Sequence, residues 1–120
     1  MTIIMLCGGR KCPRLSPLTI KKVKDAHDAG HKFVVGDCYG ADVMFQFILK
    51  TIGADAVVYY IGDMPRNNPQ GFPTVKVHGF AQTDKDDAMR AIANDIIYEP
   101  VGAGSGTMAS VRYFRDRTLQ

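Results

Sequence analysis

Three glycine-containing segments carry the residues that this sequence offers for binding a phosphate. They are residues 8–10 (Gly-Gly-Arg), residues 36–42 (Gly-Asp-Cys-Tyr-Gly-Ala-Asp) and residues 102–107 (Gly-Ala-Gly-Ser-Gly-Thr). Glycine lets a ligand approach the backbone closely, and an arginine guanidinium can donate two hydrogen bonds to one phosphate. The hydroxyls of Ser105 and Thr107 can donate to the same anion. These residue types predict a cradle for a phosphate or a phosphorylated sugar.

Each of the three segments follows a run of residues that is typical of a buried strand. Residues 2–6 precede the first segment, residues 33–35 the second and residues 96–98 the third. Segments with helical spacing of apolar residues separate the runs, and Ser16-Pro17 is typical of the start of a helix. The carboxyl ends of parallel strands meet at one edge of a sheet, where ligands bind. Helices that begin there add unpaired N–H groups that favour an anion.

The alternation of strands and helices continues along the whole chain. Further strands are expected over Ala56–Ile61 and Thr74–Val77, and a helix over residues 83–94, where Asp86 indicates a capping box. This order predicts an α/β fold, a Rossmann-like three-layer sandwich with a mostly parallel sheet of about five strands. The 120 residues fit one domain, residues 1–120.

Composition excludes several classes of protein. The formal net charge is only +3 and the basic residues are dispersed, which disfavours nucleic acid as a partner. No apolar run approaches the roughly 20 residues that span a membrane, and the N-terminal residues lack a basic leader. The three cysteines and three histidines form no metal-ligand pattern. We therefore expect a cytoplasmic protein with reduced thiols, no metal ion, no cofactor and no membrane partner.

A helix expected over Ala41–Ile52 is apolar almost all round. A domain of this size has too little surrounding structure to cover every side of one helix. Exposed apolar patches of this kind mark interfaces between subunits. The sequence therefore predicts a homodimer or a larger homo-oligomer, with Phe45, Phe47 or Ile48 at the contact.

Several polar residues of the three segments have two interpretations each. Asp37 and Asp42 either cap the following helix or contact a ligand, and Tyr39 either stacks on a base or covers the edge of the sheet. Glu99 either binds a ribose hydroxyl or belongs to the turn with Pro100. The glycines themselves also occur at strand-to-helix turns for the turn geometry alone.

In their order along the chain, the three segments resemble the SLOG superfamily. This Rossmann-like group includes the Lonely-guy phosphoribohydrolases and the DNA-processing protein A, and the resemblance covers residues 3–115, closest to the small standalone members. It implies one nucleotide-binding domain. The expected phosphate contacts are Gly8, Gly9, Arg10, Gly104, Ser105, Gly106 and Thr107, and the expected base or sugar contacts are Asp37, Tyr39, Gly40 and Asp42.

The sequence departs from the Lonely-guy enzymes at two positions. Their glutamate three residues after the threonine is Ser110 here. Alignment on Met89 puts Lys85 near the place of their catalytic arginine, and lysine lacks the bidentate guanidinium. The sequence therefore offers no obvious residue as the general acid or base that would cleave an N-glycosidic bond.

Three interpretations of function follow. The first is a sensor or sequestering module that binds a nucleotide-derived, phosphorylated small molecule. The alternative is a hydrolase or transferase acting on the N-glycosidic bond of a nucleoside monophosphate, with Asp37, Asp42 or Lys85 as catalytic candidates and Asp63 as a further substitute carboxylate. Binding of single-stranded DNA is disfavoured by the modest charge. Whether the chain is an enzyme stays open at this point.

Overall fold

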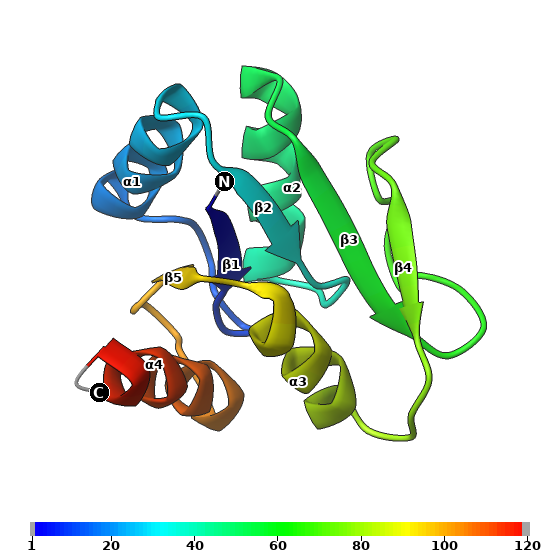
Figure 1. The fold of residues 1–120 in the computed structure, drawn as a ribbon. Helices are drawn as coiled ribbons and strands as arrows, with labels where there is room; N and C mark the ends of the chain where they lie inside the picture. The colour runs from blue at the N-terminus through cyan, green and yellow to red at the C-terminus, as the bar shows by residue number, and fades with distance from the viewer. Residues whose placement is uncertain (1, 119–120) are drawn as a thin grey trace.

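Five parallel strands form one sheet, and two helices cover each of its faces (Figure 1). The computed structural model describes residues 2–118 of the chain. The strands are β1 (Ile3–Cys7), β2 (Lys32–Val35), β3 (Ala56–Ile61), β4 (Thr74–Val77) and β5 (Asp95–Tyr98). The helices are α1 (Pro17–Asp28), α2 (Ala41–Ile52), α3 (Gln82–Ile92) and α4 (Ser105–Thr118). The predicted Rossmann-like α/β fold is confirmed.

The strand order β4-β3-β2-β1-β5 has one reversal, between β1 and β5. The chain adds strands outward from β1 to β4, and α3 then crosses back over the sheet to β5 on the other side of β1. In β1, Met5 lies beside Val34 of β2 and beside Ile96 of β5. Turns that leave β1 and β5 run in opposite directions, so they separate above this strand pair and leave a crevice there.

Alternate residues of β1 enter two separate cores. Ile4 and Leu6 pack with α1 and α2 on one face of the sheet, and Met5 and Cys7 pack with α3 and α4 on the other. All four side chains are buried, because a strand in the middle of a parallel sheet has no face toward water. The carboxyl end of β1 is therefore fixed from both sides.

The predicted helix starts are right for α1 and wrong in detail for α3. Ser16 is the N-cap of α1 and Pro17 its first residue, as expected. The capping box expected from Asp86 does not form, because α3 begins at Gln82 and the Asp84 carboxylate accepts the N–H groups of Phe80 and Ala81. Asp86 is thereby left available for other contacts.

Helix α2 buries more of its surface than the sequence pattern suggests. Phe45 is fully buried in the core beside β1 and β2, so the expectation that it lies at a subunit contact is wrong. Phe47 remains 55% exposed and Ile48 is partly buried. Among residues 2–118, no helix is both long and apolar enough to cross a membrane.

Candidate functional site

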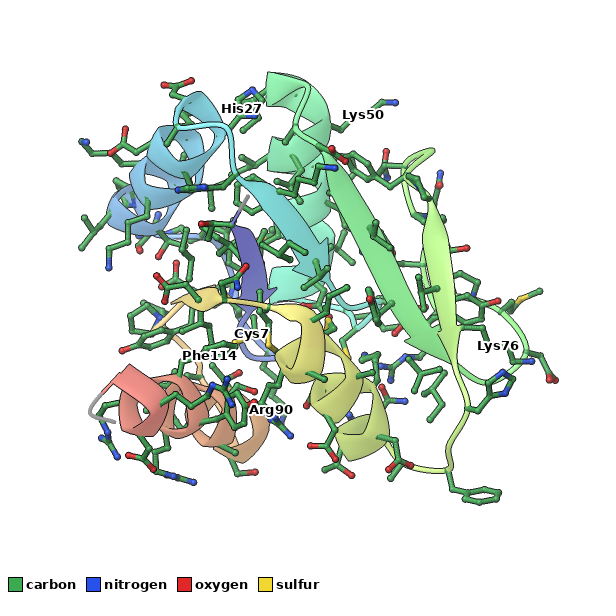
Figure 2. All side chains as sticks on the ribbon, in the orientation of Figure 1. Cys7, His27, Lys50, Lys76, Arg90 and Phe114 are labelled. Carbon is green, nitrogen blue, oxygen red and sulfur yellow. The ribbon has the colours of Figure 1, made fainter. Side chains whose placement is uncertain are left out.

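A cavity of about 450 Å³ opens where β1 ends, between α3 and α4. Figure 2 shows Cys7 at the end of β1 close to Arg90 of α3 and Phe114 of α4, on the face of the sheet that these two helices cover. The cavity brings together nine of the residues that the sequence singled out for binding or catalysis. They are Gly8, Gly9, Arg10, Asp42, Lys85, Gly104, Ser105, Gly106 and Thr107.

The first turn of α4 forms one wall of the cavity. The N–H groups at the start of a helix have no intrahelical partners, so those of residues 105–107 are available to an anion. A Cβ atom on Gly104 would meet nothing within 4 Å, and one on Gly106 would meet only Asp86 Oδ2, at 3.7 Å. The protein itself therefore leaves room for side chains at both glycines, and this room faces the cavity.

The glycines of the β1–α1 turn have a different role. A Cβ atom on Gly9 would lie 1.8 Å from the Gly102 carbonyl oxygen, and one on Gly8 would lie 2.5 Å from Ala41 Cβ. Gly40 has a positive φ of 83°, and its Cβ would lie 2.4 Å from the Arg10 carbonyl oxygen. These three glycines are required because the turns pack directly on one another. The turn holds Arg10 exposed beside the cavity.

Asp37, Tyr39 and Gly40 do not line the cavity, although the sequence placed all three on the base or sugar of the ligand. Asp37 is fully buried, where its carboxylate accepts Lys85 Nζ at 3.0 Å and the Arg66 backbone N–H at 2.9 Å. Burial alone would raise the pKa of Asp37, but the Arg66 N–H and the Lys85 ammonium outweigh it and hold that pKa below its ordinary value. Tyr39 is 64% exposed, so neither side chain contacts the predicted phosphate cradle.

Lys85 is held charged and nearly inaccessible. Its side chain is 1% exposed, and its ammonium contacts Asp37 Oδ1 at 3.0 Å and Cys38 Sγ at 3.2 Å. Burial lowers the pKa of Lys85, but the neighbouring Cys38, Asp42 and Asp37 raise it above the ordinary lysine value. Lys85 is therefore protonated at neutral pH, and its charge offsets that of Asp37.

Asp42 is the carboxylate of the second segment that reaches the cavity. It is 7% exposed, and its Oδ2 accepts the Cys38 N–H at 3.0 Å. Burial raises the pKa of Asp42 to about 6, against the opposing effects of the Lys85 ammonium and the Cys38 N–H. Asp42 is therefore partly protonated in mildly acidic solution.

Asp86 also lines the cavity, although the sequence pattern was not used to predict it there. Asp86 lines the cavity from α3 and faces the start of α4 at Gly106. Burial raises the pKa of Asp86, and Lys85 and Arg90 only partly offset that effect. Gln82, Asp86 and Met89 follow one another at helical spacing, a signal that could have placed Asp86 on the same face as its neighbours.

Two further assignments from the sequence change in the structure. Glu99 does not line the cavity, because its buried carboxylate accepts the backbone N–H groups of Ser16 and Val101. Arg90 Nη1 donates to Ser110 Oγ at 2.8 Å. The arginine that contacts Ser110 is thus Arg90, which follows Met89 in the sequence. Lys85, which the alignment put near the catalytic arginine of the Lonely-guy enzymes, contacts Asp37 instead.

The remaining residues of the cavity lining come from β1 and the turn after it, from residues 36–42, from α3 and from residues 102–110. They are Met5, Leu6, Cys7, Lys11, Cys38, Gln82, Thr83, Met89, Gly102 and Ser110. Within residues 2–118, no three histidine, cysteine, aspartate or glutamate side chains are grouped so that they could hold a metal ion.

No protein-family model, curated protein or solved structure matches this chain. The SLOG resemblance therefore stays an expectation.

Proposed function

We propose that this chain binds a nucleotide or a nucleotide-derived phosphorylated ligand in the cavity at the carboxyl edge of its sheet, as a sensing or sequestering domain. The observation that carries the proposal is the open space at Gly104 and Gly106. Neither glycine has a positive φ, and neither is needed for packing. Their small size leaves the start of α4 uncovered toward the cavity. An uncovered helix start of this kind favours the binding of a phosphate.

Charge and size support the same ligand class. Arg10 and Lys11 line the cavity with exposed side chains. Among residues 2–118, neither forms a salt bridge or a side-chain hydrogen bond with the rest of the chain. The cavity volume of about 450 Å³ lies in the range of small-molecule sites. The phosphate would lie on α4 beside Arg10, and the base or sugar would extend toward Asp42.

Native mass spectrometry of the freshly purified protein tests this proposal by detecting a retained nucleotide. Calorimetric titration with the four ribonucleoside 5′-monophosphates measures affinity directly. Arg10→Ala is expected to weaken binding about tenfold to a hundredfold, as for the loss of a charge-assisted hydrogen bond. Arg14→Ala is the matched control, because Arg14 is exposed but does not line the cavity. No retained ligand and no binding in the titrations would refute the proposal.

The second candidate function is hydrolysis of the N-glycosidic bond of the bound nucleotide. It is favoured by one observation, the two carboxyl groups of Asp42 and Asp86 in the cavity, both with pKa values raised by burial. In this reaction water attacks C1′, the C1′–N bond breaks, a protonated carboxyl group delivers a proton to the leaving base, and the other, ionised carboxylate accepts the proton that the attacking water loses. Chromatographic detection of free base distinguishes this enzyme from the binding domain.

A further inference from the structure

Asp86 lies at the place in the cavity where the proposed function puts a phosphate. Its Oδ2 is 3.7 Å from the position of a Cβ atom on Gly106, in the first turn of α4. Within residues 2–118 the Asp86 side chain has no hydrogen bond and no salt bridge. The charged or titratable groups that act on it come from α3, the β1–α1 turn, α2 and β1. They are Lys85, Asp87, Arg90, Arg10, Asp42 and Cys7.

The cavity has little net charge of its own once its internal ion pair is considered. Lys85 is neutralised by Asp37, with which it forms a buried salt bridge of 3.0 Å. Two cations of the lining, Arg10 and Lys11, then face two carboxyl groups, Asp42 and Asp86. When both carboxyl groups are ionised, their charges equal in number those of Arg10 and Lys11, and the start of α4 adds a dipole equivalent to about half an elementary charge.

We infer that Asp86 makes the cavity select a phosphodiester, which carries one negative charge, over a terminal phosphate monoester, which carries two. This inference rests on the proposed function, because it takes the phosphate to lie at the start of α4. The second charge of a monoester adds repulsion from the Asp86 carboxylate, while the two cations of the lining, Arg10 and Lys11, are balanced in number by the carboxylates of Asp42 and Asp86. A phosphodiester gains the same helix N–H groups without that additional repulsion.

A matched set of ligands tests the inference without a change in the rest of the nucleotide. The probes are the four ribonucleoside 5′-monophosphates and their 5′-phosphate methyl esters, titrated calorimetrically at pH 8. At this pH the monophosphates carry two charges and their methyl esters one. The wild-type protein is expected to bind the methyl ester of its preferred nucleoside more tightly than the monophosphate.

Asp86→Asn keeps the shape of the side chain and removes its charge. This variant is expected to bind the monophosphate about tenfold more tightly, equivalent to about 1.4 kcal/mol, and to change the affinity for the methyl ester less than about twofold. Asp116→Asn is the control, because Asp116 of α4 is 66% exposed and does not line the cavity. Its ratio of the two affinities should equal that of the wild type.

Two results would overturn the inference alone. One is a wild-type protein that binds the monophosphate more tightly, and the other is an Asp86→Asn variant that changes both affinities by the same factor. The wild-type comparison needs no variant, so it stands even if Asp86→Asn fails to fold. Absence of binding for all eight probes would overturn the proposed function and this inference together, which separates the two failures.

Discussion

Replacing Lys85 with methionine should destabilise the protein far more than removal of a surface lysine. Lys85 and Asp37 are 1% and 0% exposed and form a salt bridge of 3.0 Å, so Lys85→Met leaves a buried carboxylate without its ammonium. Breaking a buried pair on one side costs about 3–5 kcal/mol. Arg66 Nη2 lies 3.5 Å from the same carboxylate and is about one-third exposed, which places the cost near the lower end, about 3 kcal/mol.

Urea unfolding and thermal melting measure this cost. For a domain of this length, a loss of about 3 kcal/mol lowers the melting temperature by about 10–15 °C. Lys21→Met is the matched control, because it removes an exposed pair with Asp25, and such pairs contribute about 0–1 kcal/mol. The double variant Lys85→Met/Asp37→Asn removes the stranded charge and should recover a large part of the loss.

Two results would refute this reasoning. The first is a Lys85→Met variant no less stable than Lys21→Met, which would mean that solvent or Arg66 compensates Asp37 fully. The second is a double variant as unstable as the single one, which would mean that lost packing, and not a stranded charge, causes the effect. Either result would reopen Asp37 and Lys85 as residues maintained for chemistry.

Four further predictions concern the cavity and the surface. Gly106→Val covers the open start of α4 and should abolish nucleotide binding with an unchanged circular dichroism spectrum, whereas equal affinity would assign Gly106 to the turn alone. The pKa of Asp42 is about 6 in the folded chain and about 3.9 when unfolded, so the folded state binds the extra proton between these values. Its contribution to stability is therefore lost as the pH rises from about 4 to about 6, by about 2–3 kcal/mol, and urea titrations should show this loss in the difference in stability between the wild type and Asp42→Asn. A domain that only binds its nucleotide should release no free base from nucleoside monophosphates, and chromatography that finds turnover of about one per second would contradict this and direct attention to Asp86→Asn. Phe47 is 55% exposed on α2, so light scattering should give at least a dimer mass at micromolar concentration and a monomer for Phe47→Glu, and a wild-type monomer would exclude this contact.

The fold was largely predictable because its signals are local. Unbroken apolar runs, helical spacing and the proline after Ser16 predicted the strands and helices, and the structure has the expected Ala41–Ile52, Ala56–Ile61 and Thr74–Val77 at the same bounds. Alternation of strands with helices then requires parallel strands, whose carboxyl ends share one edge. The meeting of the first and third glycine segments at one cavity follows from that requirement.

The roles of individual side chains in the site depended on long-range packing. Gly9 and Gly106 are both glycines in a segment that follows a strand, yet a Cβ atom would collide with Gly102 at Gly9 and find room at Gly106. Lys85 and Asp86 are adjacent on α3, and the path of this helix across the sheet turns one toward Asp37 and the other toward the start of α4. Sequence alone determined the layers of this protein and the edge where its ligand-binding chemistry is expected. Only the tertiary structure decided which carboxylates are neutralised and which remain available, because that depends on contacts between residues distant in the chain.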